Sequence, residues 1–218
     1  PRAVAGLGAA LALVLLSGDP QSFVVCCAGA GLVVLSISGT RLLPWLFAAW
    51  ALAGGLAAPQ LFTSLGVAVE SAAGAQSLEQ AEVWSGHPLR ILEWTFGPLW
   101  LNDSREVLAA GAGARLESAM GSLWYDSEHL GPAAVSLAAI GAWSLRGSPA
   151  ARGVMAGGGL VFALWLGRHT PLYALVYRLV PPWRPFRYPE KLLPFVFLLL
   201  ALAAAAGMER VWAAKHRR

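Results

Sequence analysis

Charge is scarce in this sequence: Asp, Glu, Lys and Arg make up only 13% of its 218 residues. Hydrophobic residues make up 57%, above the roughly 45–50% that is typical of soluble domains, and the mean hydropathy is +0.58. Several apolar runs approach the roughly 20 residues that a helix needs to cross a bilayer. One of them, residues 192–207, has no charged residue. The composition therefore excludes an ordinary soluble domain and predicts an all-α integral membrane protein.

Motifs for several common chemistries are also missing. The only cysteines, Cys26 and Cys27, are adjacent in an apolar run, which predicts neither a disulfide framework nor metal ligands. The four histidines lack zinc spacing, and the sequence contains no Walker loop, dinucleotide-binding fingerprint or nucleophile elbow. We therefore predict no metal site among these residues. The chain begins at Pro1 without the basic start or the cleavage site of a signal peptide, so we expect an internal piece of a longer protein.

Six apolar segments dominate the chain, and their lengths favour helices because a barrel strand would alternate over about ten residues. We predict a polytopic bundle of about six transmembrane helices that forms a single domain over residues 1–218. Stretches rich in Gly and Ala, such as 28–31 and 156–159, suit close helix packing in lipid. In the third segment, Pro44 suits a first helical turn, whereas Pro59 predicts a kink or an end. The segments are residues 3–17, 22–38, 42–65, 130–145, 153–167 and 192–212.

Residues 66–129 form the longest polar connection, and we predict an extracytoplasmic loop that contains short interfacial helices. The positive-inside rule favours a cytoplasmic N-terminal end and C-terminal tail, because eight basic residues then lie inside and five outside, with the long loop left out of the count. The net charge of +4 then reflects loop bias and contact with anionic lipid rather than nucleic acid. The inner residues are Arg2, Arg41, Arg146, Arg152, Arg210, Lys215, Arg217 and Arg218; the outer ones are Arg168, Arg178, Arg184, Arg187 and Lys191.

These outer cations lie in residues 168–191, a basic loop rich in proline and aromatic residues. Thr170 can cap a helix and Pro171 suits its first turn, so we predict a short interfacial helix over 172–180. Prolines keep the following stretch, PPWRPFRYPEK at 181–191, extended. Arginine forks beside aromatic rings suit a phosphate carried on a lipid; the alternative is snorkelling to lipid headgroups with aromatic anchoring. The candidates for binding a donor phosphate are Arg184, Arg187, Lys191, Arg168 and His169.

Two acidic residues are candidates for catalysis. Asp19 lies in a turn between two apolar segments, where it is either an acid that faces an outer cavity or a structural turn residue. Glu70 lies at or near membrane depth, where carboxylates usually face a cavity or a partner rather than lipid. We name Arg90 and Arg187 as candidate partners of Glu70.

Residues 84–93 (WSGHPLRILE) are the best organised part of the long loop. Pro88 can begin a helix that places Arg90 and Glu93 three residues apart on one side. We predict that this helix presents its polar side chains to an outer cavity; the alternative is a plain ion pair on the surface. The candidates for cavity or acceptor contacts are His87, Arg90, Glu93 and Tyr188.

Three stretches together resemble the bacterial YfhO-like membrane proteins, which belong to the GT-C superfamily of polytopic glycosyltransferases. They are AAPQLFTSLGVAVESA at 57–72, WSGHPLRILEWTFGP at 84–98 and, above all, LGRHTPLYALVYRLVPPWRPFRYPEKLLPFVFLLLALAAAAGMERV at 166–211. The last stretch follows that family's pattern of a basic, proline-rich loop that runs straight into a transmembrane helix. The order and spacing of the three stretches agree with the family over most of the chain.

The resemblance implies an enzyme of the bacterial inner membrane that transfers a sugar from a polyprenyl-phosphate donor to a cell-envelope acceptor on the extracytoplasmic side. It implies that basic residues in the later loops hold the donor phosphate, and that an acid in the first outer loop acts as a base or helps to hold a divalent metal. That first loop would lie upstream of Pro1, so we expect this chain alone to be inactive. Two alternatives stay open: a transporter or flippase of lipid-linked saccharides, and a glycan polymerase or ligase that uses a diphosphate-linked donor.

Overall fold

The computed structural model describes residues 2–70, 77–97, 128–184 and 186–216, and every regular element within these ranges is a helix. Proline begins many of these helices, because its fixed φ suits the first turn and its missing N–H is not needed there. The longer helices are α1 (Arg2–Leu16), α2 (Pro20–Ser38), α3 (Leu43–Leu56), α4 (Ala58–Glu70), α9 (Pro132–Leu145), α10 (Pro149–Trp165), α11 (Pro171–Leu179) and α12 (Leu193–Lys215). The short ones are α5 (Leu78–Ala81), α6 (Glu93–Phe96) and the 3₁₀ turns η2 (Pro88–Leu92), η3 (Gly167–His169), η4 (Pro181–Trp183) and η5 (Pro189–Leu192).

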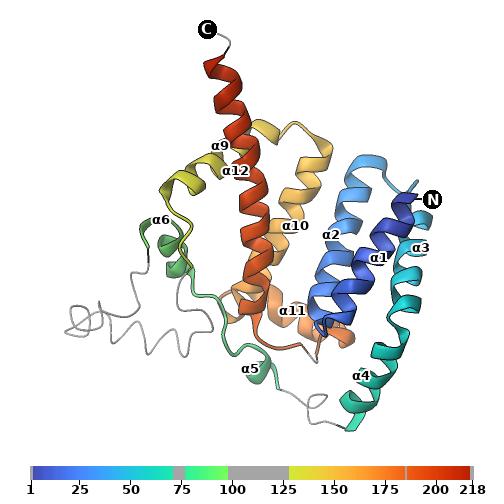
Figure 1. The fold of residues 1–218 in the computed structure, drawn as a ribbon. Helices are drawn as coiled ribbons and strands as arrows, with labels where there is room; N and C mark the ends of the chain where they lie inside the picture. The colour runs from blue at the N-terminus through green and yellow to red at the C-terminus, as the bar shows by residue number, and fades with distance from the viewer. Residues whose placement is uncertain (1, 71–76, 98–127, 185, 217–218) are drawn as a thin grey trace, which may run out of the picture.

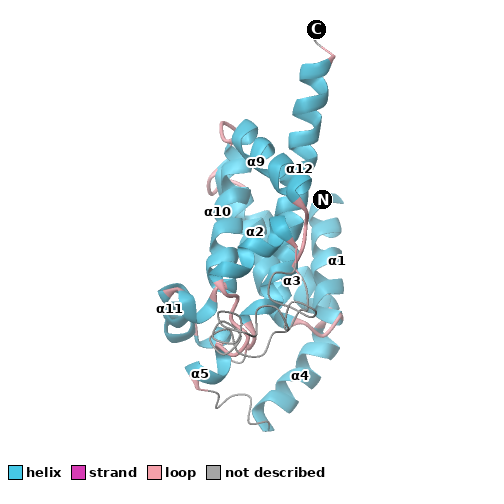
Figure 2. Cartoon of the chain, turned by 90° about the vertical axis from the view of Figure 1, so that its left-hand side faces the viewer, coloured by secondary structure: helices cyan, strands magenta, loops and turns pink. Residues whose placement is uncertain are grey.

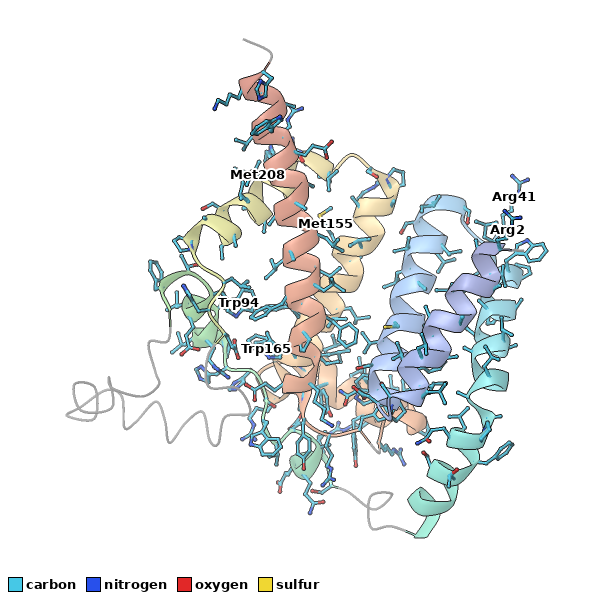
Figure 3. All side chains as sticks on the ribbon, viewed as in Figure 1. Arg2, Arg41, Trp94, Met155, Trp165 and Met208 are labelled. Atoms are coloured by element: carbon cyan, nitrogen blue, oxygen red, sulfur yellow. The ribbon has the colours of Figure 1, made fainter. Side chains whose placement is uncertain are left out.

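The long helices pack in two groups (Figure 1). Helices α1, α2 and α3 surround a small core that contains Leu11 and Ala53, while α9, α10 and α12 form the second group. Helix α2 packs along α10 and joins the two groups. The larger core lies around α10, α11 and α12 and contains Trp94, Trp165 and Tyr173; Figure 3 shows both tryptophans beside α12. This core connects the long helices to the segments around Ala81, Trp94 and Trp183.

Helices α9 and α12 cross closely because glycine lies at the contact on both of them. A Cβ atom on Gly141 would overlap the backbone carbonyl oxygen of Ala203, and a Cβ atom on Gly207 would overlap that of Leu137. Backbone atoms of two packed helices cannot turn aside as a flexible side chain can, so a larger residue would push the helices apart. By contrast, a Cβ atom on Gly29, in one of the stretches highlighted by the sequence, would meet no atom within 4 Å.

Two helical stretches in the described residues, Pro20–Ser38 and Pro189–Lys215, are long and apolar enough to cross a membrane. A third span results if α3 and Ala58–Ser64 are taken together, although this pair is bent by 69°. The bend confirms the kink predicted from Pro59, which lies in the first turn of α4 and cannot continue the hydrogen-bond ladder of α3. Helices α1 and α9 are apolar but shorter. Length and composition thus support an all-helical fold with two spans, or three with the bent pair.

Helices α4, α5 and α11 lie toward the end of the molecule that is away from the chain termini (Figures 1 and 2). Both termini and the turns α2–α3 and α9–α10 lie toward one end, where Figure 3 also places Arg2 and Arg41. The α1–α2 turn, α5 and α11 lie toward the other end. The two ends therefore carry the two sets of basic loops on which the predicted orientation depends.

Both short helices expected from proline are present. The helix predicted over 172–180 is α11, but Thr170 caps it in position only, because its hydroxyl donates to the Ala163 carbonyl (2.8 Å) instead of accepting from the helix. The helix predicted to begin at Pro88 consists of the 3₁₀ turn η2 followed by one turn of α-helix, α6. Its first turn is capped by His87, whose Nδ1 accepts a hydrogen bond from the Leu89 N–H (3.2 Å).

Candidate functional site

Three segments that are far apart in the sequence meet and form what we call the junction: residues 81–94, 165–170 and 183–192, with residue 185 outside the described part. Backbone hydrogen bonds connect the segments and fix their position relative to one another. These bonds run from Gly86 N to Trp165 O (2.8 Å), from Tyr188 N to Ala81 O (3.2 Å) and from Glu190 N to Trp84 O (3.1 Å).

The buried Tyr173 of α11 contacts two of these segments through its hydroxyl group. Its hydroxyl group lies 3.2 Å from the carbonyl oxygen of Ala81 and 3.2 Å from that of Phe186. On the other side, Gly86 lies so close to Trp165 that a Cβ atom there would overlap the indole ring. A buried tyrosine with a bonded hydroxyl and a glycine seated on an indole leave the junction little freedom to move.

Trp84 and Tyr188 form an aromatic pair at the surface of the junction, with ring centroids 4.3 Å apart. Both have left-handed backbones, with φ of 59° and 67°, a conformation that bulky residues rarely adopt and that costs about 1–3 kcal/mol each. The Arg187 guanidinium and the Lys191 ammonium lie 5.0 and 5.5 Å from the Tyr188 ring centroid. The packed segments thus impose a strained geometry that gathers two cations over one aromatic ring.

His87 and His169 form a second pair, in which the rings meet edge to face with centroids 4.9 Å apart. Because His87 Nδ1 accepts the Leu89 N–H, the ring carries its proton on Nε2 when it is neutral. Burial lowers the pKa of both imidazoles below 6.5, and His87 and Arg168 lower the pKa of His169 further. The neutral forms of both rings are therefore favoured, but the unprotonated nitrogen of His87 is engaged by Leu89, so His169 is the better candidate to accept a proton. The Arg168 N–H donates to Ser85 Oγ (3.0 Å) and so connects the two segments that carry the histidines.

Arg90 lies inside the junction with its side chain fully buried and contacts three carboxylates, a group we call the Arg90 cluster. Its Nε lies 3.3 Å from Glu93 Oε2, and its Nη1 lies 2.7 Å from Glu128 Oε1 and also contacts Glu190 Oε1. Trp94 Nε1 donates to Glu128 Oε2 (3.0 Å). Arg90 and Glu93 do pair as their spacing suggests, but they are buried within the fold, contrary to our expectation that they line an outer cavity.

Two sequence-predicted residues, Asp19 and Arg184, have their side-chain contacts away from the polar side chains of the junction. Asp19 caps α2: its carboxylate accepts from the Ser22 N–H (3.2 Å) and from the Ser22 hydroxyl, which favours the structural interpretation of this turn. Arg184 turns back to α11, where its Nε donates to the Tyr177 carbonyl (3.4 Å). Glu70 is the last residue of α4, and its side chain lies outside the described part.

An apolar cavity of about 360 Å³ opens between α2, α10, α11 and α12. Near the junction its wall is formed by Val176, Val180 and Trp183, and deeper in the bundle it is lined by Gly157 and Leu199. A second apolar cavity, of about 500 Å³, lies between α9, α10 and α12 and reaches Trp94. Both cavities are large enough for part of a hydrocarbon chain and too apolar to hold a charged group.

Glu128, Glu190 and Trp84 are the residues of the site that sequence reasoning missed. Glu190 had a local signal, since it is an acid between Pro189 and Lys191 in a stretch otherwise rich in cations. Glu128 and Trp84 had none, because the partner that fixes each of them comes from a distant segment. Such contacts leave no periodic pattern in the sequence.

Among the described residues, no three side chains of His, Cys, Asp or Glu converge in a way that could hold a metal ion. Comparison of the chain with protein-family models, with curated proteins and with solved structures found no match. The function is therefore inferred from the junction, the cavities and the apolar helices.

Proposed function

We propose that the chain is part of a membrane glycosyltransferase that transfers a sugar from a polyprenyl-phosphate-linked donor to a cell-envelope acceptor. The protein lies in the bacterial inner membrane with about six spans, its N-terminal end and C-terminal tail are cytoplasmic, and the junction faces the extracytoplasmic side. The resemblance of three stretches to the YfhO-like proteins supports this proposal. Two helical stretches long enough to span a membrane, and the separation of the basic loops onto two ends, also support it.

The observation that carries the proposal is the position of the apolar cavity next to the basic loop. The cavity wall includes Val176, Val180 and Trp183, and the next residue, Arg184, donates back to the Tyr177 carbonyl, so its guanidinium lies against the same short helix. A polyprenyl phosphate needs both environments side by side, since its chain gains by leaving water while its phosphate pairs with guanidinium groups.

The imidazole pair suits the chemistry of sugar transfer. The oxygen of an acceptor hydroxyl attacks the anomeric carbon of the donor, the bond from that carbon to the phosphate oxygen breaks, and a base takes the hydroxyl proton. In this proposal the neutral imidazole of His169 accepts that proton, and Arg187 and Lys191 stabilise the charge on the departing phosphate. Tyr188, between the two cations, contacts the sugar or the acceptor.

Binding to the full-length protein in lipid nanodiscs tests the two halves of the site separately. We expect the double variant Arg187→Ala/Lys191→Ala to bind both a long-chain polyprenyl phosphate and a short-chain isoprenyl phosphate at least tenfold more weakly, a loss of about 1.4 kcal/mol or more. Arg152→Ala, at the opposite end, is the control. Gly157→Leu, which places a side chain in the cavity, should weaken only long-chain binding, whereas Gly55→Leu, which lies outside both apolar cavities and where a Cβ atom meets nothing within 4 Å, should weaken neither.

Equal binding by the double variant and the wild type would contradict the phosphate site. A Gly157→Leu variant that binds the long chain normally would contradict the role of the cavity. If the full-length protein binds the lipid and moves it between the leaflets of a vesicle without transferring its sugar, the flippase is the better explanation.

A further inference from the structure

A groove of about 520 Å³ lies between α9 and α12, toward the end of the molecule that carries the chain termini (Figure 1). It lies next to the close contact of Gly141 with Gly207, and Arg210 follows about one helical turn after Gly207. One wall of the groove carries apolar side chains and an indole ring, and the other carries a guanidinium. The lining residues are Ala139, Ile140, Trp143 and Ser144 of α9 and Arg210 of α12.

A second guanidinium lies on the indole that lines this groove. The Cζ atom of Arg146 is 3.6 Å from the centroid of the Trp143 ring. Stacking on an indole holds an arginine side chain in place and does not use its N–H donors, which point outward in the plane of the guanidinium. The donors of Arg146 therefore remain available to an acceptor beside the groove.

The two arginines of the groove have no compensating carboxylate in the part of the chain that the structure describes. Both are exposed, and the side chain of neither Arg146 nor Arg210 forms a hydrogen bond or an ion pair with another described residue. The acid nearest in the sequence, Glu209, precedes Arg210 directly, and successive residues of a helix point about 100° apart. The groove is thus a positive site that favours an anion.

The apolar wall of the groove indicates which anion fits. Trp143 is 70% exposed and Ile140 is 41% exposed, on a helix whose sequence is almost wholly apolar. A soluble phosphate ester would leave these side chains uncovered, whereas the hydrocarbon chain of a lipid gains by covering them. Trp at the level of basic residues is typical of the membrane interface, where lipid phosphates also lie. The combination therefore favours a phospholipid over a free phosphate.

We propose that this groove is a binding site for one anionic phospholipid. The phosphate lies between Arg146 and Arg210, because a guanidinium can pair with two phosphate oxygens at once, and an acyl chain covers Ile140 and Trp143. Basic pockets between helices on the cytoplasmic side of a membrane are typical sites for such headgroups. Since α9 and α12 each form one wall, the bound lipid also connects these two helices. The site lies away from the junction, so this inference does not depend on sugar transfer.

Native mass spectrometry of the full-length protein in detergent, with dioleoyl phosphatidylglycerol added in steps, tests the proposal. We expect one molecule of this lipid to bind at least about tenfold more tightly than dioleoyl phosphatidylcholine, a difference of about 1.4 kcal/mol or more. The double variant Arg146→Ala/Arg210→Ala should lose this preference. The control is Arg152→Ala, which alters an exposed cation of α10 outside the groove and should keep the affinity within about twofold.

Two further measurements separate this site from general charge attraction and from a site for free phosphate. Arg146→Lys keeps the charge but loses the planar fork, so it should weaken phosphatidylglycerol binding at least about threefold. Glycerol phosphate, which carries the phosphate without acyl chains, should not displace the lipid. Equal binding of the two lipids would overturn the proposal. An equal loss in Arg152→Ala, or normal binding by Arg146→Lys, would also overturn it in favour of general charge attraction, and displacement by glycerol phosphate would replace the lipid with a soluble phosphate ester.

Discussion

The strongest prediction concerns Arg90, the cation at the centre of the buried cluster. Replacing it with methionine keeps much of the apolar stem but leaves three buried carboxylates without their guanidinium. Removing one partner of a buried ion pair typically costs about 3–5 kcal/mol. For a chain of this size about 1 kcal/mol shifts the melting temperature by about 2–4 °C. We therefore expect Arg90→Met to lower the melting temperature by about 6–20 °C at neutral pH.

The loss should also depend on pH, which distinguishes charge from packing. In the variant Glu128 loses the guanidinium that lowers its pKa, so the pKa of this carboxyl rises further above that of the unfolded chain. A carboxyl that must keep its proton costs about 1.4 kcal/mol for every pH unit above its unfolded pKa. The destabilisation of Arg90→Met should therefore be small near pH 5 and should grow toward pH 8.

Thermal unfolding in detergent micelles, followed by tryptophan fluorescence at several pH values, measures this effect. Arg178→Met is the matched control, because this arginine is exposed and its loss should cost less than about 1 kcal/mol. Adding Glu128→Gln and Glu190→Gln to Arg90→Met should recover about half of the lost stability, since the surplus charge is then removed. A melting temperature of Arg90→Met within about 2 °C of the wild type at pH 8 would refute the reasoning, and an equal loss at pH 5 and pH 8 would assign it to packing.

Three further predictions address the helix contact, the α2 cap and the orientation. Gly207→Ala should destabilise the protein by about 1–3 kcal/mol, because its Cβ atom would overlap a backbone carbonyl of α9, whereas Gly54→Ala, which meets no atom within 4 Å, should not; thermal unfolding compares them. Asp19→Asn should retain both stability and the sugar transfer proposed for the full-length protein, since Asn also caps helices; loss of transfer at normal stability would restore the catalytic interpretation. A cysteine introduced at Arg187 should react with a membrane-impermeant maleimide added outside intact cells, and labelling from the cytoplasmic side alone would reverse the orientation.

The sequence predicted the helices well where local chemistry decides them. Pro59 predicted the break between α3 and α4, and the combination of Thr170 and Pro171 predicted α11 to within one residue at each end. Helix α10 begins at Pro149, four residues before the predicted segment, because Ser148 caps it by accepting the Ala151 N–H (3.4 Å). Because a polar cap precedes this first turn and the turn contains an arginine, a prediction based on apolar runs places the start of the helix too late.

The candidate site was predicted only as far as its contacts are local. The pairing of Arg90 with Glu93 follows from their spacing of three residues, and the proximity of Arg187 to Tyr188 follows from adjacency. The contact of Arg90 with Glu190 spans 100 residues and leaves no mark on the hydrophobic pattern. The burial of Arg90 and Glu93 could not be predicted for the same reason. An isolated Arg–Glu pair in a polar loop is typical of the surface, and only the contacts with the distant acids and Trp94 show that this pair lies inside the fold.

The same separation along the chain gives the Arg90 cluster an order of assembly in time. During synthesis from the N-terminus, Arg90 emerges together with Glu93, meets Glu128 later, and can reach Glu190 only after 100 further residues have been made. Glu190 lies directly before α12, the last helix, so the ion cluster is complete only once that helix is in place. Until then a partly neutralised arginine stays exposed on the unfinished chain, which makes the cluster a marker that distinguishes a fully assembled bundle from one that still lacks its final helix.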